Sequence, residues 1–249
     1  MTLLEARQLT KIFSDGTAAL RDVDLTIAQG EFIVLAGTNG SGKTVLAKHC
    51  NGLIKPTSGR ILWQGRPVEE QLQTVRRQVG FVFQDSDNQI VGQTVAADVA
   101  FGPENLCLPA AEVEQRVRAA LEAVEMAQLR DQQPYRLSGG LKRKLAIAGI
   151  LAMEPQLIIL DEPFTGLDYP GVVQVLKAII SLHRRGHAIM IITHELEKVL
   201  AHATRLVIMV RGTIVRDGPP QVVAPLARDY GLRAGSNPDP KVETLTWLT

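Results

Sequence analysis

A glycine-rich stretch near the start of the chain carries the residues with the clearest chemistry. Its pattern is Gly37-x-x-x-x-Gly42-Lys43-Thr44, and it follows an apolar run, 32–36, that predicts a buried strand. Glycines let successive backbone N–H groups curve around a polyphosphate without Cβ clashes. The cation of Lys43 suits the β- and γ-phosphates, and the hydroxyl of Thr44 can ligate Mg²⁺. The residues expected to hold the nucleotide are Gly37, Thr38, Asn39, Gly40, Ser41, Gly42, Lys43 and Thr44.

The alternative is a glycine-rich turn between a strand and a helix with a chance lysine. A predicted strand before the loop and a predicted helix after it favour a phosphate-binding loop of the Walker A type. The helix that opens near Gly42 would add the positive end of its dipole to the anion site.

Two acids follow a second apolar run, 157–160. In phosphate-loop enzymes an acid at this place serves Mg²⁺, which is the role expected of Asp161. The next residue, Glu162, is placed to act as a general base that polarises a water for attack on the γ-phosphate. Alone, a strand that ends in two acids is more often a solvated turn, so the catalytic interpretation depends on the Walker A loop upstream.

A third motif, Leu-Ser-Gly-Gly-Leu, occupies 137–141 and precedes a helical pattern. Ser138, Gly139 and Gly140 expose backbone N–H groups at a helix start, which predicts a second anion site. The alternative is a serine cap followed by flexible glycines. The basic run 142–144 is predicted to be a solvated face.

Composition narrows the class of protein. The 249 residues, 45% of them hydrophobic, are enough for one large α/β domain with or without an inserted subdomain. A net charge of +1 gives no reason to expect a nucleic-acid partner. The two cysteines, Cys50 and Cys107, lack a CxxC spacing and favour a reduced compartment. The first residues do not resemble a signal peptide, and the apolar runs are too short to span a bilayer, so any membrane role needs a partner.

Strand and helix patterns alternate around these motifs. The expected strands are 3–10, 20–27, 32–36, 61–64, 79–83, 157–160, 188–193 and a terminal hairpin of 206–210 and 214–216, and the expected helices are 44–53, 69–78, 110–124, 171–185 and 195–203. This alternation predicts an α/β fold with a mainly parallel sheet covered by helices. Helical periodicity in 85–133 predicts an inserted helical subdomain between β-rich parts, 1–84 and 134–220. Together they form one domain, 1–235, followed by a loosely attached tail, 236–249, in which Pro238 and Pro240 interrupt a weak pattern.

Six motifs stand in a fixed order: Walker A, Gln84, LSGG, the strand with its two acids, Gly166-Leu167-Asp168, and His194 after a strand. This order, over residues 3 to about 220, resembles the nucleotide-binding subunits of ABC transporters. The resemblance implies a P-loop NTPase core, a small antiparallel β subdomain and an inserted α-helical subdomain. It also implies ATP hydrolysis with ATP and Mg²⁺, in a dimer that holds two ATP molecules head to tail. Because all six motifs are present, a homodimer is favoured over a heterodimer.

The resemblance also implies roles for single residues. Phe13 matches the aromatic residue that stacks on adenine, although the family often has tyrosine there. Gln84 would touch Mg²⁺ and the attacking water and report to the membrane partner. The 138–140 segment would contact the γ-phosphate held by the other subunit, with Asp168 at the dimer seam and His194 on the γ-phosphate. The predicted catalytic residues are thus Lys43, Gln84, Glu162 and His194, and the predicted Mg²⁺ ligands are Thr44, Gln84 and Asp161.

Two positions depart from the family pattern. Leu141 stands where the family usually has glutamine, and Phe164 stands where it usually has serine or threonine. Neither position touches the chemistry expected of Lys43 or Glu162. Leu141 belongs to the LSGG motif, so this departure bears on the γ-phosphate contact that the resemblance implies between the two subunits.

A narrower resemblance rests on FQDSDNQ at 83–89, DVAFGPEN at 98–105, AIAG at 146–149 and LAMEP at 151–155. These segments are similar to the ATPases of energy-coupling factor transporters, including the cobalt/nickel type. That group imports vitamins or transition-metal ions through a substrate-binding membrane protein and a separate transmembrane coupling protein. The resemblance implies a peripheral location on the cytoplasmic face of the cell membrane. The alternative is ordinary variation within another class of importer ATPase.

The segment after Gln84, 85–104, is expected to bind the coupling protein and to contribute little to nucleotide chemistry. Asn88 and Gln89 are expected near the groove that receives the coupling helices. The expected apolar anchors are Ile90, Val91 and Phe101.

Two other functions compete with transport. A soluble ABC ATPase of DNA repair or translation usually carries a long coiled-coil insertion or two fused ATPase units, and these 249 residues contain neither. A phosphate-loop kinase would leave the LSGG segment unexplained.

Overall fold

The computed structural model describes residues 1–233 and 241–248. Its strands are β1 (Thr2–Ile12), β2 (Ala18–Ala28), β3 (Phe32–Ala36), β4 (Ser58–Trp63), β5 (Arg66–Pro67), β6 (Val79–Val82), β7 (Leu157–Asp161), β8 (Ala188–Thr193), β9 (Arg205–Val210) and β10 (Thr213–Gly218). Its α-helices are α1 (Lys43–Cys50), α2 (Leu72–Gln78), α3 (Val95–Asn105), α4 (Ala110–Ala123), α5 (Gly139–Leu151), α6 (Tyr169–Arg184) and α7 (Pro220–Val223). The α/β fold class predicted from the strand and helix patterns is confirmed.

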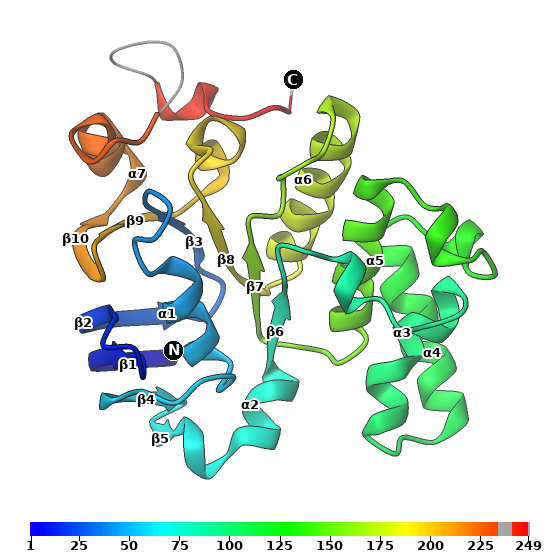
Figure 1. Ribbon diagram of the computed structural model, residues 1–249. Coiled ribbons are helices and arrows are strands. Elements are labelled where there is room, and N and C mark those ends of the chain that lie inside the picture. The colour runs from blue at the N-terminus through cyan, green and yellow to red at the C-terminus, as the bar shows by residue number, and fades with distance from the viewer. Residues whose placement is uncertain (234–240, 249) are drawn as a thin grey trace.

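The larger sheet has the order β10-β9-β3-β8-β7-β6 (Figure 1). Its strands are parallel except at the β9–β10 pair, which is the expected terminal hairpin. The first strand of that hairpin, β9, also pairs in parallel with β3 and so extends the parallel sheet. Ala36 pairs with Thr193, and Asp161 pairs with Ile192. The residues that follow β3, β7 and β8 therefore emerge at the same sheet edge, where ligands bind in open α/β sheets.

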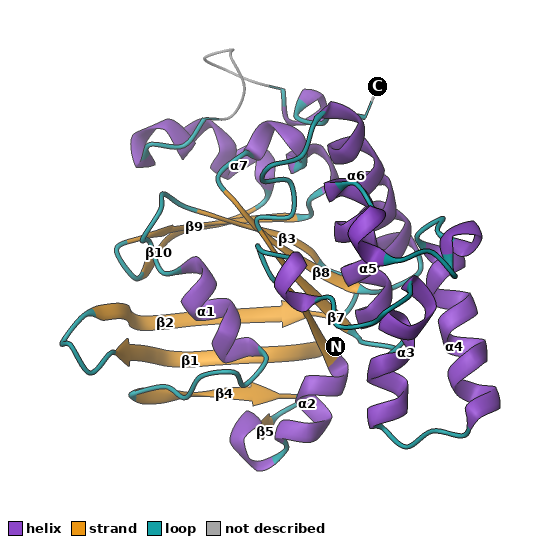
Figure 2. Cartoon of the chain, turned by 45° about the vertical axis from the view of Figure 1, so that its right-hand side comes forward, coloured by secondary structure: helices purple, strands orange, loops and turns teal. Residues whose placement is uncertain are grey.

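Side chains of the central strands alternate between two buried clusters. Phe32 and Val34 belong to the cluster that also contains apolar residues of α5 and α6, whereas Ile33 and Leu35 belong to the cluster under α1 and the smaller sheet. Figure 2 shows the two layers that cover this sheet. Burial on both faces is the reason that β3, β7 and β8 read as uninterrupted apolar runs in the sequence.

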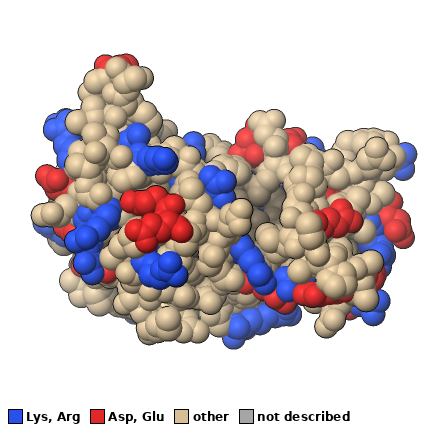
Figure 3. Space-filling view, turned by 90° about the horizontal axis from the view of Figure 1, so that it is seen from below, with Lys and Arg blue, Asp and Glu red and all other residues tan. Residues whose placement is uncertain are grey.

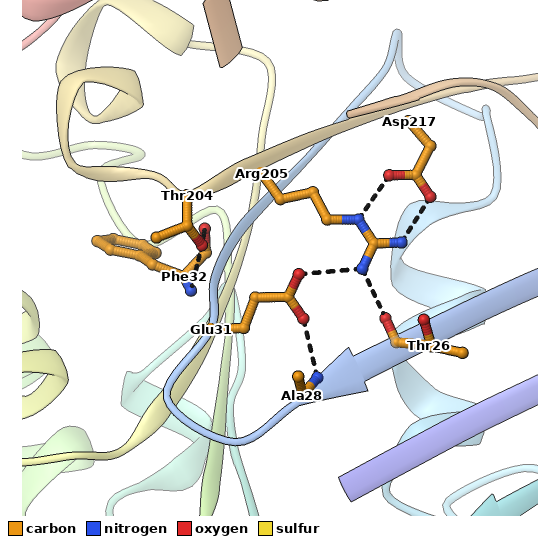
Figure 4. Close-up of polar contacts among 7 residues, drawn as sticks. All are labelled: Thr26, Ala28, Glu31, Phe32, Thr204, Arg205 and Asp217. Carbon is orange, nitrogen blue, oxygen red and sulfur yellow. Dashed lines mark hydrogen bonds and ion pairs between the residues drawn. The ribbon is translucent and has the colours of Figure 1, made fainter. Parts of the chain in front are cut away.

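The smaller sheet is antiparallel, with the order β2-β1-β4-β5. One side chain, Arg205 of β9, fastens it to the larger sheet (Figure 4). Its guanidinium donates to Asp217 Oδ1 at 2.5 Å and Oδ2 at 2.6 Å, to Glu31 Oε1 at 3.0 Å and to the carbonyl of Thr26 in β2 at 2.9 Å. Glu31 is fixed in turn, because its Oε2 accepts from the Ala28 backbone N–H at 2.8 Å.

The helical side of the molecule is formed by α3, α4 and α5, on the right in Figure 1. The predicted amphipathic helix is present as α4, with Val113, Val117 and Leu121 buried. Although α5 begins after residue 133, it packs against both α3 and α4. The subdomain limits at 85 and 133 stay a prediction.

Three expectations about local structure are wrong. Residues 195–203 form two 3₁₀ turns, Leu196–Lys198 and Leu200–His202, in place of one helix. The Ala201 N–H donates to the carbonyl of Leu245, at 3.0 Å, so a tertiary hydrogen bond competes with the helical one.

The other two errors concern exposure. In the basic run, Arg143 and Lys144 are each only 4% exposed, because α5 is enclosed by α3, α4 and α6. The tail is not loose over 241–248, because Val242 and Leu245 are buried in the main core. Pro238 and Pro240 lie outside the described residues.

Candidate active site

The Walker A loop joins β3 to α1 and needs glycine at two places. A Cβ on Gly37 would lie 2.4 Å from Ser41 Oγ and 2.5 Å from the carbonyl oxygen of Met209. Gly42 has φ +101°, and a Cβ there would lie 2.6 Å from the carbonyl oxygen of Ala19. The loop can hold this shape only without side chains at these positions. Thr38, Asn39 and Gly40 are exposed at its tip.

Lys43 lies under the loop with 7% of its surface exposed. Its Nζ donates to the carbonyl oxygen of Gly37 at 2.8 Å and to that of Thr38 at 3.1 Å. Burial lowers the pKa of Lys43, and the charges of Glu162 and Asp161 oppose that shift. An ammonium held by loop carbonyls can turn to phosphate oxygens when a nucleotide enters the loop.

Thr44 and Asp161 meet across the sheet edge. Thr44 Oγ1 donates to Asp161 Oδ2 at 2.8 Å. Burial raises the pKa of Asp161, the Thr44 hydrogen bond lowers it, and the charge of Glu162 raises it. Within 1–233 and 241–248, no three His, Cys, Asp or Glu side chains gather into a metal cage. The hydroxyl and carboxylate oxygens fit Mg²⁺, which typically takes one or two protein ligands and completes its shell with phosphates and water.

Glu162 and His194 form a second pair beside them. His194 Nδ1 lies 2.9 Å from Glu162 Oε1, and a carboxylate oxygen is an acceptor, so we assign the donating N–H of the ring to Nδ1. The Glu162 side chain is 10% exposed and that of His194 is 50% exposed. Glu162 Oε2 is buried and has no hydrogen-bond partner among the described residues. This oxygen is an acceptor that one small donor, such as a water, would satisfy.

The backbone at Glu162 is also unusual. Its φ is +46°, in the left-handed region that side chains other than glycine rarely adopt, and its N–H donates to the carbonyl of Ile192 in β8 at 2.9 Å. A strained backbone at a buried acid is typical of functional sites.

The LSGG segment and Asp168 lie at the starts of two packed helices. Ser138 Oγ accepts from the Leu141 N–H at 3.4 Å and caps α5, and Asp168 Oδ1 accepts from the Gly171 N–H at 3.0 Å and caps α6. A Cβ on Gly140 would lie 3.0 Å from Gly171 Cα, so glycine permits the close contact of the two helices. Ser138, Gly139 and Asp168 are exposed, and within the described chain none of their hydrogen bonds reaches Lys43, Asp161 or Glu162.

Gln84 follows β6, which pairs in parallel with β7, so it leaves the sheet at the same edge as Asp161. Its side chain is exposed. The preceding residue is anchored, because Phe83 O accepts from Arg143 Nη1 at 2.6 Å. Sequence reasoning missed Arg143, whose only signal was its place one turn after LSGG.

In the segment after Gln84, the Gln89 side chain turns back to β6, where it accepts from the Phe83 N–H and donates to the Phe81 carbonyl, both at 3.1 Å. Asn88 donates to Asp85 at 2.6 Å. Both amides therefore hold the loop itself. The place of Asn88 and Gln89 near the coupling groove stays a prediction.

Phe13 lies on the surface, whereas the two departures from the family pattern, Leu141 and Phe164, pack in or against the main core. Phe13 is 39% exposed at the end of β1, with Lys11 Nζ 5.5 Å from its ring centroid. Phe164 is 1% exposed in the main core, and Leu141 is half-buried against it. These two departures serve packing.

The family model described as ABC transporter matches residues 20–165 of this chain. The chain is 43% identical over 226 residues to the energy-coupling factor transporter ATP-binding protein EcfA of Methanocaldococcus jannaschii, covering 90% of this chain and 81% of that protein. It is also 43% identical to the cobalt import ATP-binding protein CbiO of Syntrophus aciditrophicus, over 98% of this chain and 88% of that protein.

Solved structures agree with these relatives. CbiO1 from Clostridium perfringens, part of the ABC transporter complex CbiONQ, superimposes with a TM-score of 0.84 at 37% identity, covering 90% of both chains. A dimeric ATP-binding cassette in a post-hydrolysis state, bound to ADP and Pi, superimposes with a TM-score of 0.77 at 27% identity, over 87% of this chain and 98% of that one. The predicted family and fold are confirmed, and the chain belongs to the ABC transporter family, as an ATPase subunit of the energy-coupling factor and cobalt-import type.

Proposed function

We propose that the chain hydrolyses ATP to power an importer of vitamins or of transition-metal ions such as cobalt or nickel. The observation that carries this proposal is the pair of Glu162 and His194. One carboxylate oxygen is held by His194, and the other is buried with no partner among the described residues, beside Lys43 and Asp161. A fixed acid with one unsatisfied oxygen suits a general base for a single water.

The chemistry divides among the residues as follows. A water oxygen attacks the γ-phosphorus, the bond from that phosphorus to the bridging β–γ oxygen breaks, and Glu162 Oε2 accepts the proton of the water. Lys43 would stabilise the phosphate charge, and His194, whose side chain is 50% exposed, would contact the γ-phosphate. Thr44 and Asp161 would hold Mg²⁺, which neutralises charge on the phosphates when bound. Gln84, next to the same sheet edge, would contact Mg²⁺ and the water.

A second subunit is needed for the proposed roles of three exposed residues, Ser138, Gly139 and Asp168. In a head-to-tail homodimer, the Ser138 segment of one subunit would close on the γ-phosphate held by the other, with Asp168 at the seam. The exposed aromatic ring of Phe13 would stack on adenine.

Two contacts connect the nucleotide site to the helical side. Phe83, next to Gln84, is bonded to Arg143, and Asp87 pairs with Lys142 at 2.9 Å. The two basic residues, Arg143 and Lys142, both belong to α5, which begins in the LSGG segment. A displacement of Gln84 by the γ-phosphate would therefore move α5 and the helices packed on it.

The docking surface for the coupling protein is proposed over 85–104. Val91 is 59% exposed and Phe101 is 52% exposed, whereas Ile90 is half-buried against the core, so the first two are the better anchors. A groove of about 440 Å³ lies between α3 and α4, lined by residues that include Ala100, Leu108 and Val113. In the face seen from below, charges of both signs are scattered, and the surface is hollowed between the sheet-rich side and the helices (Figure 3).

The proposed location at the membrane depends on the coupling protein. No helix within 1–233 or 241–248 is long and apolar enough to cross a membrane. Attachment to the coupling protein and the substrate-binding membrane protein would hold the subunit at the cytoplasmic face of the membrane. The alternative, an ATPase of another ABC importer class, uses the same site and differs only in these partners.

The test of the chemistry is Glu162→Gln in the purified protein. ATP binding should persist while hydrolysis falls by about 100-fold or more, because the amide cannot take the proton. ATP-bound dimers should accumulate and appear by light scattering. Parental turnover in Glu162→Gln would assign the base to another residue, with His194 the first to examine.

The test of docking uses single exposed residues. Phe101→Asp and Val91→Asp should weaken pull-down of the membrane components while leaving ATP affinity of the free subunit unchanged, because a charge would be buried against the partner. The matched control is Val222→Asp, since Val222 is 65% exposed on α7, away from this segment. If assembly survives while ATP binding collapses, 85–104 belongs to the nucleotide site.

A further inference from the structure

The described part of the C-terminal region, 241–248, is a strap that contacts Tyr169 and the segment 198–202. We use the name C-terminal strap for these residues. Val242 and Leu245 anchor it in the core, and the Leu245 carbonyl accepts from the Ala201 N–H at 3.0 Å. His202 Nε2 lies 2.7 Å from Thr246 Oγ1. The strap is therefore fixed to the segment that follows His194.

Trp247, near the end of the strap, contacts two elements at once. Its ring lies 5.5 Å from that of Tyr169, between centroids, and the Tyr169 hydroxyl donates to the Trp247 carbonyl at 3.3 Å. On another side, Lys198 Nζ lies 4.6 Å from the indole centroid. Lys198 is only 7% exposed and also pairs with Glu195 at 2.5 Å. The indole thus lies between the start of α6 and the first 3₁₀ turn after His194.

Both elements lead directly to residues of the proposed mechanism. Tyr169 follows Asp168, the cap of α6 and the proposed seam residue. Glu195 follows His194, which holds the carboxylate of Glu162. Glu195 also forms a parallel bridge with Arg233, outside the strap. Trp247 therefore ties together two loops that must both be in place when the dimer closes on ATP.

We propose that Trp247 is a positioning residue for ATP hydrolysis, which fixes the Asp168 loop relative to the His194 loop. The inference rests on the proposed function. Without the indole, Lys198 would keep its pair with Glu195 and α6 would keep its cap. Among residues 241–248, only the hydrogen bond from the Tyr169 hydroxyl to the carbonyl of residue 247 would still join the strap to α6. Within the described part of the chain, the hydrogen bond, ring contact and cation–π contact of Trp247 go to Tyr169 and Lys198 and not to the Walker A loop, so binding of ATP would be preserved. Misplacement of His194 would instead slow the chemical step.

The experiment measures kcat and KM for ATP in the purified full chain, with thermal melting on the same samples. Trp247→Ala should lower kcat roughly tenfold, with KM and the melting temperature close to those of the parent. Trp247→Phe should recover much of the loss, because a ring remains for both neighbours. Glu243→Ala, an exposed position of the same strap, is the matched control and should behave as the parent. An unchanged kcat in Trp247→Ala, or a rise in KM alone, would overturn the proposal.

A second variant and a second readout keep the test independent of folding and of activity. Tyr169→Phe removes only the hydroxyl that bonds to the Trp247 carbonyl, and it should lower kcat by about threefold. Hydrogen exchange of residues 168–171 and 194–198 should become faster in Trp247→Ala, whether or not the protein hydrolyses ATP. A parent protein that hydrolyses no ATP would refute the proposed function, whereas unchanged exchange in both segments would refute the role of Trp247.

Discussion

Replacement of Arg205 gives the sharpest test of how the two sheets are held together. Arg205→Met keeps most of the apolar stem but removes four hydrogen bonds, three of them to the carboxylates of Glu31 and Asp217. The side chains are 20% exposed for Arg205, 16% for Glu31 and 32% for Asp217. The change would leave two acids and the Thr26 carbonyl partly buried without their cation.

The magnitude follows from that burial. Removal of one partner of a buried ion pair costs about 3–5 kcal/mol, and the exposure of Asp217 allows part of it to be regained by hydration. We therefore expect a loss of about 3 kcal/mol in the free energy of unfolding. For a chain of this size each kcal/mol shifts the melting temperature by about 2–4 °C, so the midpoint should fall by about 6–12 °C.

Urea and thermal denaturation of Arg205→Met measure this loss directly. The control is Arg118→Met, because the Arg118 side chain is 64% exposed and its 3.8 Å pair with Glu114 lies on the surface, where such pairs contribute about 0–1 kcal/mol. A double-mutant cycle with Asp217→Asn should give a coupling energy of at least about 1 kcal/mol. The reasoning fails if Arg205→Met is no less stable than the control.

Three further outcomes are expected. Lys43→Ala should abolish tight ATP binding, measured by direct titration of the purified variant, because the phosphates lose their strongest partner; unchanged affinity would remove Lys43 from this role. Asp161→Asn should leave the melting temperature at neutral pH equal or higher, because burial raises the pKa of the native carboxyl and makes its charge costly. Mg²⁺-dependent nucleotide binding of this variant should fall, and a large loss of stability would contradict the expectation. Burial lowers the pKa of His49 below its ordinary 6.5, so the unfolded chain binds the proton more tightly and the free energy of unfolding should decrease as the pH falls below about 6.5. His49→Gln should flatten that acid limb in urea titrations between about pH 5 and 7, and an identical slope would assign it to other groups.

The Walker A loop and the strand patterns could be predicted from the sequence because their causes are local. Gly37 and Gly42 are required by the backbone of the loop itself, and alternation or continuity of apolar residues reflects which faces of a strand are buried. The order of the six motifs adds the family, which the comparisons confirm.

Patterns that depend on distant neighbours could not be interpreted in this way. Arg143 and Lys144 are charged yet buried, because α5 is enclosed by two helices that precede it in the sequence, α3 and α4, and by one that follows it, α6. Residues 195–203 have helical spacing, but a bond from Ala201 to Leu245 contributes to another backbone form. A local window of sequence contains none of these partners.

The sequence by itself thus determined which residues can do the chemistry: a glycine loop with Lys43, acids at the end of a buried strand, and a histidine after another strand. Only the tertiary structure decided that they meet. Thr44 and Asp161 are bonded although 117 positions apart, and Glu162 and His194 although 32 apart. The physical reason is the order β3-β8-β7, which places three parallel strands side by side so that their carboxyl ends share one edge. Strand order results from the packing of both faces of the sheet, which involves residues from the whole chain.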